Sequence, residues 1–301
     1  MARNFQDAPS GDPRYPERKP DWLKVRLPSG KNYVQLRDLM RSKGLHTVCE
    51  EARCPNIAEC WSNSTATFMI LGDTCTRSCA FCAVTTGRPL AVDPFEPGKV
   101  ARAVKQMGLS HVVVTSVDRD DLPDGGSTLF AQTIRAIRDV NPSARVEVLI
   151  PDFKGDAAAL ATVLEARPHI LNHNVETVPR LYPSVRPQAK YPRSLELLRR
   201  ARALGQGVLV KSGMMLGLGE EHEEIIATLA DLRSAGTDIV TIGQYLRPSR
   251  RHHPLVRYYS PEEFAEYRRL AMAMGFGHVE SGPLVRSSYH AHAQVPATTP
   301  G

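Results

Sequence analysis

From residue 65 onwards, short apolar runs alternate with stretches whose apolar residues recur at helical spacing. Six of the apolar runs have the length and the flanking residues of buried strands. They are 66–71, 111–116, 145–150, 169–175, 208–215 and 238–243. Helices are predicted at 100–107, 129–140, 156–166, 194–204 and 221–234, and Ser260-Pro-Glu-Glu263 is a capping box that begins a sixth.

Strands that alternate with helices favour a parallel sheet. Six strand–helix units are too few for a full eight-unit barrel, so the pattern predicts an α/β fold: a partial, open (β/α)6 TIM-like barrel. We expect the barrel over 65–281, an N-terminal extension over 1–64 and a C-terminal segment over 282–301. One short helix is expected at 33–46. Ligands of such barrels bind where the strands end, among the βα loops.

Composition excludes some classes of protein. The 301 residues are 42% hydrophobic, enough for a large core, yet no run approaches the ~18 apolar residues of a membrane span. The N-terminus has no signal-peptide run, and Asp7, Asp12 and Glu17 argue against a transit peptide. We therefore expect a cytoplasmic protein without a membrane partner. The net charge of +6 suits an acidic protein, an anionic small molecule or RNA about equally.

All six cysteines lie between residues 49 and 82, in two groups of three. Cys49, Cys54 and Cys60 are spaced C-x4-C-x5-C and are expected on irregular chain. Cys75, Cys79 and Cys82 are spaced C-x3-C-x2-C on the first βα loop. In a reducing compartment, clustered cysteines are metal ligands more often than disulfides. The C-x4-C-x5-C spacing matches no zinc ribbon, and the second group has no suitable fourth ligand nearby for a zinc site. We expect each group to hold an iron–sulfur cluster.

The second group supplies three thiolates to a cube of four irons, which leaves one iron for another ligand. This spacing, with Phe81 before the last cysteine, resembles the signature of the radical S-adenosylmethionine (SAM) superfamily. The resemblance implies that the open iron of this 4Fe–4S cluster binds SAM. One electron from the cluster would then cleave SAM to methionine and a 5′-deoxyadenosyl radical.

The first group also lacks a fourth cysteine, so its last iron is either open or bound by another side chain. The run Thr47–Trp61, with its three cysteines, and the run Val285-Arg-Ser-Ser-Tyr-His-Ala291 resemble motifs of the lipoyl synthase family. The similarity extends from about Lys19 to Ala293. It implies that Ser288 is the fourth ligand of an auxiliary 4Fe–4S cluster. The two extensions would then have to meet over the barrel mouth.

Family membership would make this chain a sulfurtransferase that inserts sulfur at C6 and C8 of a protein-bound octanoyl-lysine, giving lipoyl-lysine. The sulfur would come from the auxiliary cluster, and two SAM molecules would be used per lipoyl group. The implied partners are an octanoylated carrier domain (2-oxoacid dehydrogenase E2 or glycine cleavage H protein), a reductant such as flavodoxin or ferredoxin, and a cluster-repair carrier. No nucleic-acid partner is implied.

Polar residues at the expected strand ends are candidates for binding SAM. By the resemblance, Asn174 and Glu176 would hold the ribose hydroxyls, and Lys211 or Arg186 the carboxylate. Polar loop residues also commonly serve only as caps or ion-pair partners. His252-His253 is most simply a solvated loop feature.

The densest group of basic residues comprises Arg247, Arg250 and Arg251, with Arg257 nearby. A solvated face is one explanation, and docking of an acidic carrier domain is the other.

Two further functions stay open. A methylthiotransferase-like enzyme would also insert sulfur, but a separate C-terminal RNA-binding barrel is absent. A non-catalytic electron carrier would explain two clusters but not the barrel.

Overall fold

The computed structural model describes residues 19–24, 34, 37–38, 40, 45–51, 54, 56–62, 66–289, 291 and 294. Its central element is an eight-stranded sheet in the order β1-β2-β5-β6-β7-β8-β9-β10. The strands are β1 (His46–Thr47), β2 (Thr67–Ile70), β5 (His111–Ser116), β6 (Arg145–Leu149), β7 (Ile170–Asn172), β8 (Leu209–Leu216), β9 (Ile239–Gln244) and β10 (His278–Gly282). A separate two-stranded sheet pairs β3 (Thr74–Cys75) with β4 (Thr85–Thr86).

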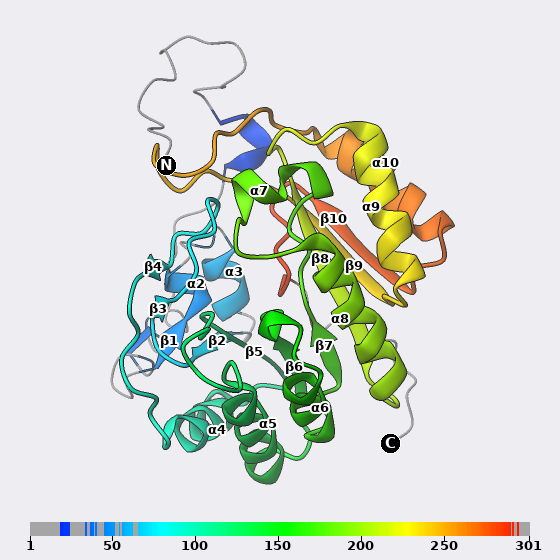
Figure 1. Cartoon of the computed structure of the whole chain (residues 1–301). Coiled ribbons are helices and arrows are strands. Elements are labelled where there is room, and N and C mark those ends of the chain that lie inside the picture. Colours follow the sequence, from blue (N-terminus) through cyan, green and yellow to red (C-terminus); the bar gives the residue numbers. More distant parts are fainter. Residues whose placement is uncertain are drawn as a thin grey trace.

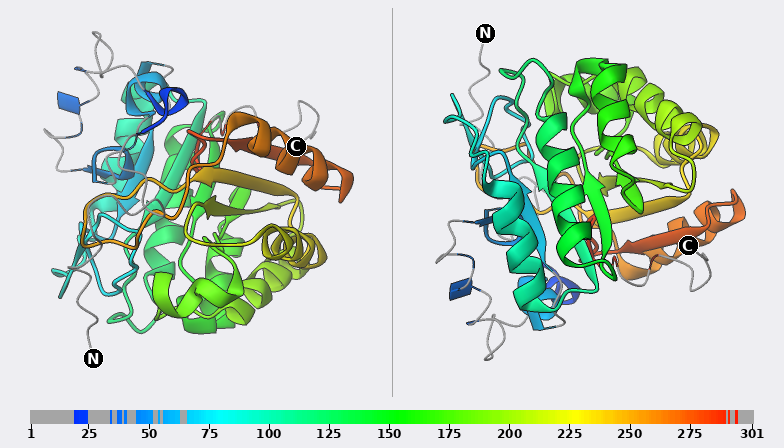
Figure 2. Two further views of the ribbon diagram at one scale, coloured as in Figure 1. Left: turned by 90° about the horizontal axis from the view of Figure 1, so that it is seen from above. Right: turned by 90° about the horizontal axis from the view of Figure 1, so that it is seen from below.

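Among the described residues, six long helices lie along the outside of the large sheet (Figures 1 and 2). They are α4 (Glu96–Met107), α5 (Ser127–Val140), α6 (Ala157–Glu165), α8 (Tyr191–Leu204), α9 (His222–Ser234) and α10 (Pro261–Ala273). Shorter helical segments are η1 (Asp21–Leu23), α2 (Val48–Glu51), α3 (Ile57–Ser62), η2 (Phe153–Gly155), η3 (Pro179–Leu181) and α7 (Tyr182–Val185). Among the described helices, none is both long and apolar enough to cross a membrane.

The predicted fold class is confirmed. Strands β2 and β5 to β10 run parallel, β1 joins the edge antiparallel to β2, and within the described residues no pairing of β1 with β10 closes the barrel. Each of the six predicted units is present. The capping box of α10 forms, since Ser260 Oγ accepts from the Glu263 amide (3.3 Å) and the Glu263 carboxylate accepts from the Ser260 amide (2.8 Å).

Three local predictions differ from the structure. Strand β10 was not predicted, because His278-Val-Glu-Ser-Gly282 has one buried apolar side chain and no alternation to reveal it. The strand expected at 169–175 ends at Asn172, and Glu176 then takes a left-handed conformation (φ 66°). The first cysteine group is largely helical, with Cys49 in α2 and Cys60 in α3. The helix expected at 33–46 lies mostly outside the described residues.

The core fills the space between the sheet and its covering helices. Val112 and Val114 of β5 and Ile134 of α5 are fully buried there. Both extensions reach the carboxyl ends of the strands, since Lys19 and Val285 line the same cavity at that end. The fold thus brings Lys19 and Val285 together at the barrel mouth.

Candidate active site

A cavity of about 570 Å³ lies at the carboxyl ends of the parallel strands, where the six-unit pattern predicts a ligand site. The second cysteine group lies on one side of it. Strand ends and the C-terminal segment complete the wall. Lining side chains come from β5 (Thr115, Ser116), β8 (Met214, Met215) and β9 (Thr241, Gln244), from the loops after β5 and β7 (Asp118, Asn174, Glu176) and from the C-terminal segment (Val285, Arg286, Ser287, Ser288).

Backbone hydrogen bonds fix the loop that carries Cys75, Cys79 and Cys82. The Thr76 amide donates to the Asp118 carbonyl (3.0 Å), and the Ala80 amide donates to the Val185 carbonyl (2.8 Å). The loop is therefore attached both to the segment after β5 and to the end of α7. All three cysteines are half-buried free thiols that line the cavity.

A long segment between β9 and α10 covers this loop from the other side. The His253 amide donates to the Ala80 carbonyl (2.7 Å), and His252 Nε2 donates to the Cys82 carbonyl (2.9 Å). Because the carbonyl can only accept, Nε2 carries the proton, and His252 Nδ1 accepts from the Ser249 hydroxyl (2.8 Å). The expectation that His252-His253 is a solvated feature is wrong, since both histidines are half-buried and hold the cysteine loop.

Burial governs the chemistry of the thiols. Desolvation raises the pKa of Cys79 to about 12 and that of Cys82 to about 11. It also raises the pKa of Cys49 to about 11, against hydrogen bonds from Thr67 and Trp61. Thiolates are the metal-binding form, so metal binding at these positions is coupled to release of protons. In the described part of the chain, no three Cys, His, Asp or Glu side chains converge on a position for a single metal ion.

The first cysteine group lies beside the C-terminal segment. A small second cavity is lined by Cys49, Cys54, Asn56, Cys60, Thr67, Arg286, Ser288 and Tyr289. Two contacts join the ends of the chain here. Thr67 Oγ1 donates to Ser288 Oγ (2.9 Å), and Asn56 Nδ2 donates to the Leu284 carbonyl (2.6 Å). The structure therefore brings Ser288 together with Cys49, Cys54 and Cys60.

A glycine of the sheet permits this approach. A Cβ atom on Gly243 of β9 would lie 2.1 Å from the Val285 carbonyl oxygen, far inside van der Waals contact. The absence of a side chain lets the segment after β10 pack directly on β9. Thr67, Arg286 and Ser288 line both cavities, so the two cysteine groups face a shared wall.

Three of the four predicted SAM-binding residues line the large cavity. Asn174 Nδ2 donates to Glu176 Oε1 (3.1 Å), and Arg186 Nη1 donates to the Asn174 backbone carbonyl (2.8 Å). Burial raises the pKa of Glu176, and Arg186 opposes that rise. Asn174 Oδ1 and Arg186 Nε are buried and have no hydrogen-bond partner among the described residues. A bound polar ligand would satisfy such atoms.

Lys211, the fourth, lies elsewhere. Its Nζ atom pairs with Glu147 Oε1 at 2.8 Å, both side chains are fully buried, and Lys211 is not a lining residue of the cavity. Lys211 is the third residue of β8, whereas Gly213, Met214 and Met215 further along that strand reach the cavity. Each residue advances a strand by about 3.3 Å, so Lys211 is too deep in the barrel.

The basic residues between β9 and α10 divide into two kinds. Arg257 pairs with Glu263 (2.7 Å) and stacks on the ring of Tyr259. Arg247 turns inward, donating to the His252 carbonyl (3.0 Å), and lines the cavity. Arg250, Arg251 and Arg257 are exposed, so of these four arginines Arg247 alone is withdrawn from the surface.

Comparison with known proteins settles the family. Residues 69–232 match the model of the radical SAM superfamily, and residues 9–54 match that of the N-terminal domain of lipoyl synthase. A lipoyl synthase of Rubrobacter xylanophilus is 66% identical over 277 residues, covering 92% of this chain and 86% of the relative. That of Symbiobacterium thermophilum is 60% identical, covering 92% and 87%. The chain belongs to the lipoyl synthase family.

Solved structures agree with this assignment at the level of the fold. The structure of methylornithine synthase aligns with this chain with a TM-score of 0.54 at 16% identity. The alignment covers 82% of this chain and 81% of that one. Streptococcus suis SuiB bound to its precursor peptide SuiA aligns with a TM-score of 0.56 at 10% identity, covering 75% and 52%. At such identities the likeness concerns the fold alone.

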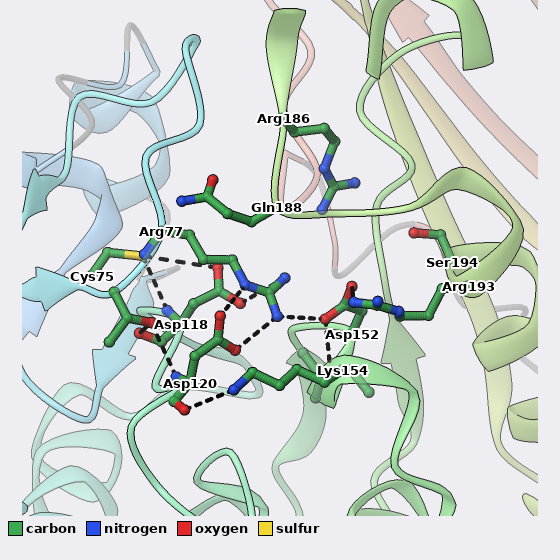
Figure 3. A network of polar contacts seen from close by, with 12 residues as sticks. Cys75, Arg77, Asp118, Asp120, Asp152, Lys154, Arg186, Gln188, Arg193 and Ser194 are labelled. Atoms are coloured by element: carbon green, nitrogen blue, oxygen red, sulfur yellow. Dashed lines mark hydrogen bonds and ion pairs between the residues drawn. The ribbon is translucent and has the colours of Figure 1, made fainter. Parts of the chain in front are cut away.

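Sequence reasoning missed several residues of this lipoyl synthase-family site. Thr67 and Arg286 line both cavities. Arg77, inside the second cysteine motif, is buried and pairs with aspartates (Figure 3). Thr67 had no signal beyond its place in a strand. Arg77 had one, because carboxylates follow both β5 and β6 and a basic residue on the neighbouring loop could pair with them.

Proposed function

We propose that this chain inserts two sulfur atoms, at C6 and C8, into a protein-bound octanoyl-lysine across the wall that its two cavities share. The observation that carries the proposal is this wall. Thr67, Arg286 and Ser288 line both cavities, each of which is also lined by three cysteines. In this reaction a carbon atom activated in one site must meet sulfur held in the other, so the two sites have to be adjacent.

Residues of the large cavity fit one 4Fe–4S cluster and SAM. Cys75, Cys79 and Cys82 would hold the cluster by three thiolates from one loop. Asn174, Glu176 and Arg186 would hold SAM, and the unpartnered buried atoms Asn174 Oδ1 and Arg186 Nε support this role. Glu176 would accept from ribose hydroxyls, while the Arg186 guanidinium suits a carboxylate. Two SAM molecules would be used per lipoyl group.

Residues of the small cavity fit a second 4Fe–4S cluster. Cys49, Cys54 and Cys60 would supply three ligands and Ser288 the fourth. A serine oxygen is a harder ligand than a thiolate and a poorer match for this iron, so it would leave more readily. When bound, the two clusters and SAM would supply the radical chemistry and the sulfur, which no side chain here can supply.

The remaining residues of the large cavity would position the substrate. Met214, Met215, Val117 and Leu149 give the wall the apolar character that an eight-carbon chain requires. Burial of the chain among these side chains would exclude water from an activated carbon. Arg250 and Arg251, exposed on the segment that covers the cysteine loop, would attract an acidic carrier domain and raise its rate of encounter.

The other partners follow from the same chemistry. The carrier would be the lipoyl domain of a 2-oxoacid dehydrogenase E2 or the glycine cleavage H protein. A small one-electron carrier such as flavodoxin or ferredoxin would reduce the first cluster, and an iron–sulfur carrier would rebuild the second. We place the reaction in the cytoplasm, where thiols stay reduced.

Anaerobic purification with iron and sulfide analysis, followed by incubation with reductant, SAM and an octanoylated carrier peptide, tests the proposal. We expect 5′-deoxyadenosine by chromatography and a peptide that gains two sulfur atoms by mass spectrometry. Absence of 5′-deoxyadenosine would contradict the proposed radical chemistry. If 5′-deoxyadenosine forms but the peptide never gains sulfur, the proposed sulfur insertion is wrong.

A further inference from the structure

Arg77 is a loop residue between the first two cysteines of the second group, yet its side chain is only 3% exposed. Its guanidinium group points into a cluster of three aspartates (Figure 3). Asp120 is held by two hydrogen bonds, from Nε (2.7 Å) and Nη2 (2.8 Å), and Asp152 by one from Nη2 (2.7 Å). Asp118 completes the set at 3.4 Å from Nη1. One side chain thus connects the cysteine loop to the ends of two neighbouring strands, β5 and β6.

The backbone of the same residues reaches the sulfur of Cys75. The amide of Arg77 donates to Cys75 Sγ at 3.4 Å, and the amide of Asp118 donates to it at 3.3 Å. The two residues whose side chains form an ion pair are therefore the two that direct an N–H group at this sulfur. The Asp118 carboxylate itself comes within 3.8 Å of Sγ. The pair controls both the dipoles and the charge around one thiol.

Hydrogen bonds to the sulfurs and local net charge are two of the factors that set the reduction potential of an iron–sulfur cluster. N–H groups directed at a thiolate stabilise the extra electron of the reduced form. A carboxylate beside the thiolate destabilises it, and a guanidinium that pairs with this carboxylate offsets that effect. The arrangement at Cys75 combines all three influences, since two N–H groups and a carboxylate contact the sulfur and the guanidinium pairs with that carboxylate.

We propose that Arg77, through its ion pair with Asp118, is a positioning residue that sets the reduction potential of the cluster held by Cys75, Cys79 and Cys82. The proposal rests on the proposed function, because it requires a cluster at these cysteines. The side chain of Arg77 keeps the backbone amides of Arg77 and Asp118 directed at Cys75 Sγ. It also balances the negative charge of the Asp118 carboxylate. Its role is to keep the cluster reducible by a mild one-electron donor.

Opposite charge changes test the proposal, because their effects on the potential have opposite signs. In Arg77→Gln the aspartates lose their balancing cation and the two amides are less firmly held, so the midpoint potential becomes more negative. In Asp118→Asn a negative charge beside Cys75 is removed while a side chain of the same shape remains, so the potential becomes more positive. A purely structural role for the pair would not separate the two variants by sign.

The measurement is a redox titration of the full-length, anaerobically reconstituted protein, followed by electron paramagnetic resonance. Alkaline buffer keeps the aspartates ionised. The signal to follow is the one that changes when SAM is added. Arg193→Gln is the matched control, since Arg193 pairs with the same Asp152 (3.1 Å) but, within the described part of the chain, forms no hydrogen bond or ion pair with the cysteine loop. We expect the control to leave the potential unchanged and the other two variants to shift it in opposite directions.

The outcomes separate the two proposals. A wild-type protein with no SAM-sensitive signal would contradict the proposed function itself. A normal wild-type signal, with Arg77→Gln and Asp118→Asn shifted the same way or not at all, would overturn only the role of Arg77. If Arg77→Gln fails to fold, Arg77→Lys keeps the cation and should stay near the wild-type potential. Asp118→Asn then decides alone, since absence of its positive shift refutes the inference.

Discussion

The hydroxyl oxygen of Thr67 lies 2.9 Å from that of Ser288, although 221 residues separate the two in the chain. Thr67 begins β2, which is paired on both sides with β1 and β5, so its position is rigid. Ser288 belongs to a C-terminal turn that has no strand partner of its own. The sheet therefore orients the serine through this contact, and the predictions for the small cavity depend on it.

Ser288→Ala should separate the two halves of the chemistry. The three cysteines of the large cavity are untouched, so SAM cleavage and hydrogen abstraction should persist. The dithiolated product should be lost, because the small cavity then lacks the serine proposed as its fourth ligand. Counting 5′-deoxyadenosine and lipoyl peptide in the same reaction checks this. Ser287→Ala is the comparison, since Ser287 lines only the large cavity and its loss should leave the second cluster's iron in place. Normal dithiolation by Ser288→Ala would refute the ligand role.

Thr67→Val should weaken the hold on Ser288 without disturbing the sheet. Valine keeps the shape of threonine but cannot donate to the serine oxygen. A hydrogen bond to an ionised oxygen contributes about 1.5–3 kcal/mol, so its loss should make serine ligation markedly weaker. We expect faster loss of iron to a chelator from the second cluster, and Thr67→Ser should restore the wild-type rate. Thr133→Val, a buried threonine of α5, controls for the substitution itself. Equal iron loss from all the variants would exclude the role of the hydroxyl.

Gly243→Ala should displace the C-terminal segment from β9. The added methyl group would overlap the Val285 carbonyl, and overpacking of this kind costs about 1–3 kcal/mol. Unfolding by urea should show this loss, and lipoyl product should fall further than 5′-deoxyadenosine. Gly277→Ala is the matched control, because a Cβ there meets its nearest atom at an ordinary 3.5 Å. If both variants lose the two products in equal proportion, the segment does not depend on this glycine.

Lys211→Met should lower stability rather than affinity for SAM. The lysine is fully buried against Glu147, and removal of one partner from a buried ion pair costs about 3–5 kcal/mol. Lys99→Met removes a half-exposed pair with Asp93 and should cost less than about 1 kcal/mol. Urea unfolding measures both. A large loss of SAM affinity with unchanged stability would instead return Lys211 to the carboxylate role that the strand-end pattern suggested.

The spacing of apolar residues was sufficient to predict the six strand–helix units, because each element buries one face and its period appears in the sequence. The cysteine motifs indicated two ligand groups for the same reason: ligands from one loop must be near one another in sequence. The ligand role of Ser288 could be predicted only from resemblance to a family, because a single serine has no spacing motif that would indicate its partners.

Other features were decided by the tertiary structure alone. The sequence pattern favoured Lys211 and Arg186 equally as basic residues of the site, yet Lys211 pairs with Glu147 deep in the barrel and Arg186 lines the cavity. Their depth depends on strand length and register, which apolar patterns do not specify to a single residue. Arg77, Asp118 and Cys75 also meet only because β2 and β5 are neighbours in the sheet. The sequence by itself indicated the candidate ligands, because ligands from one loop are close in sequence, and long-range packing determined which of these residues face each other.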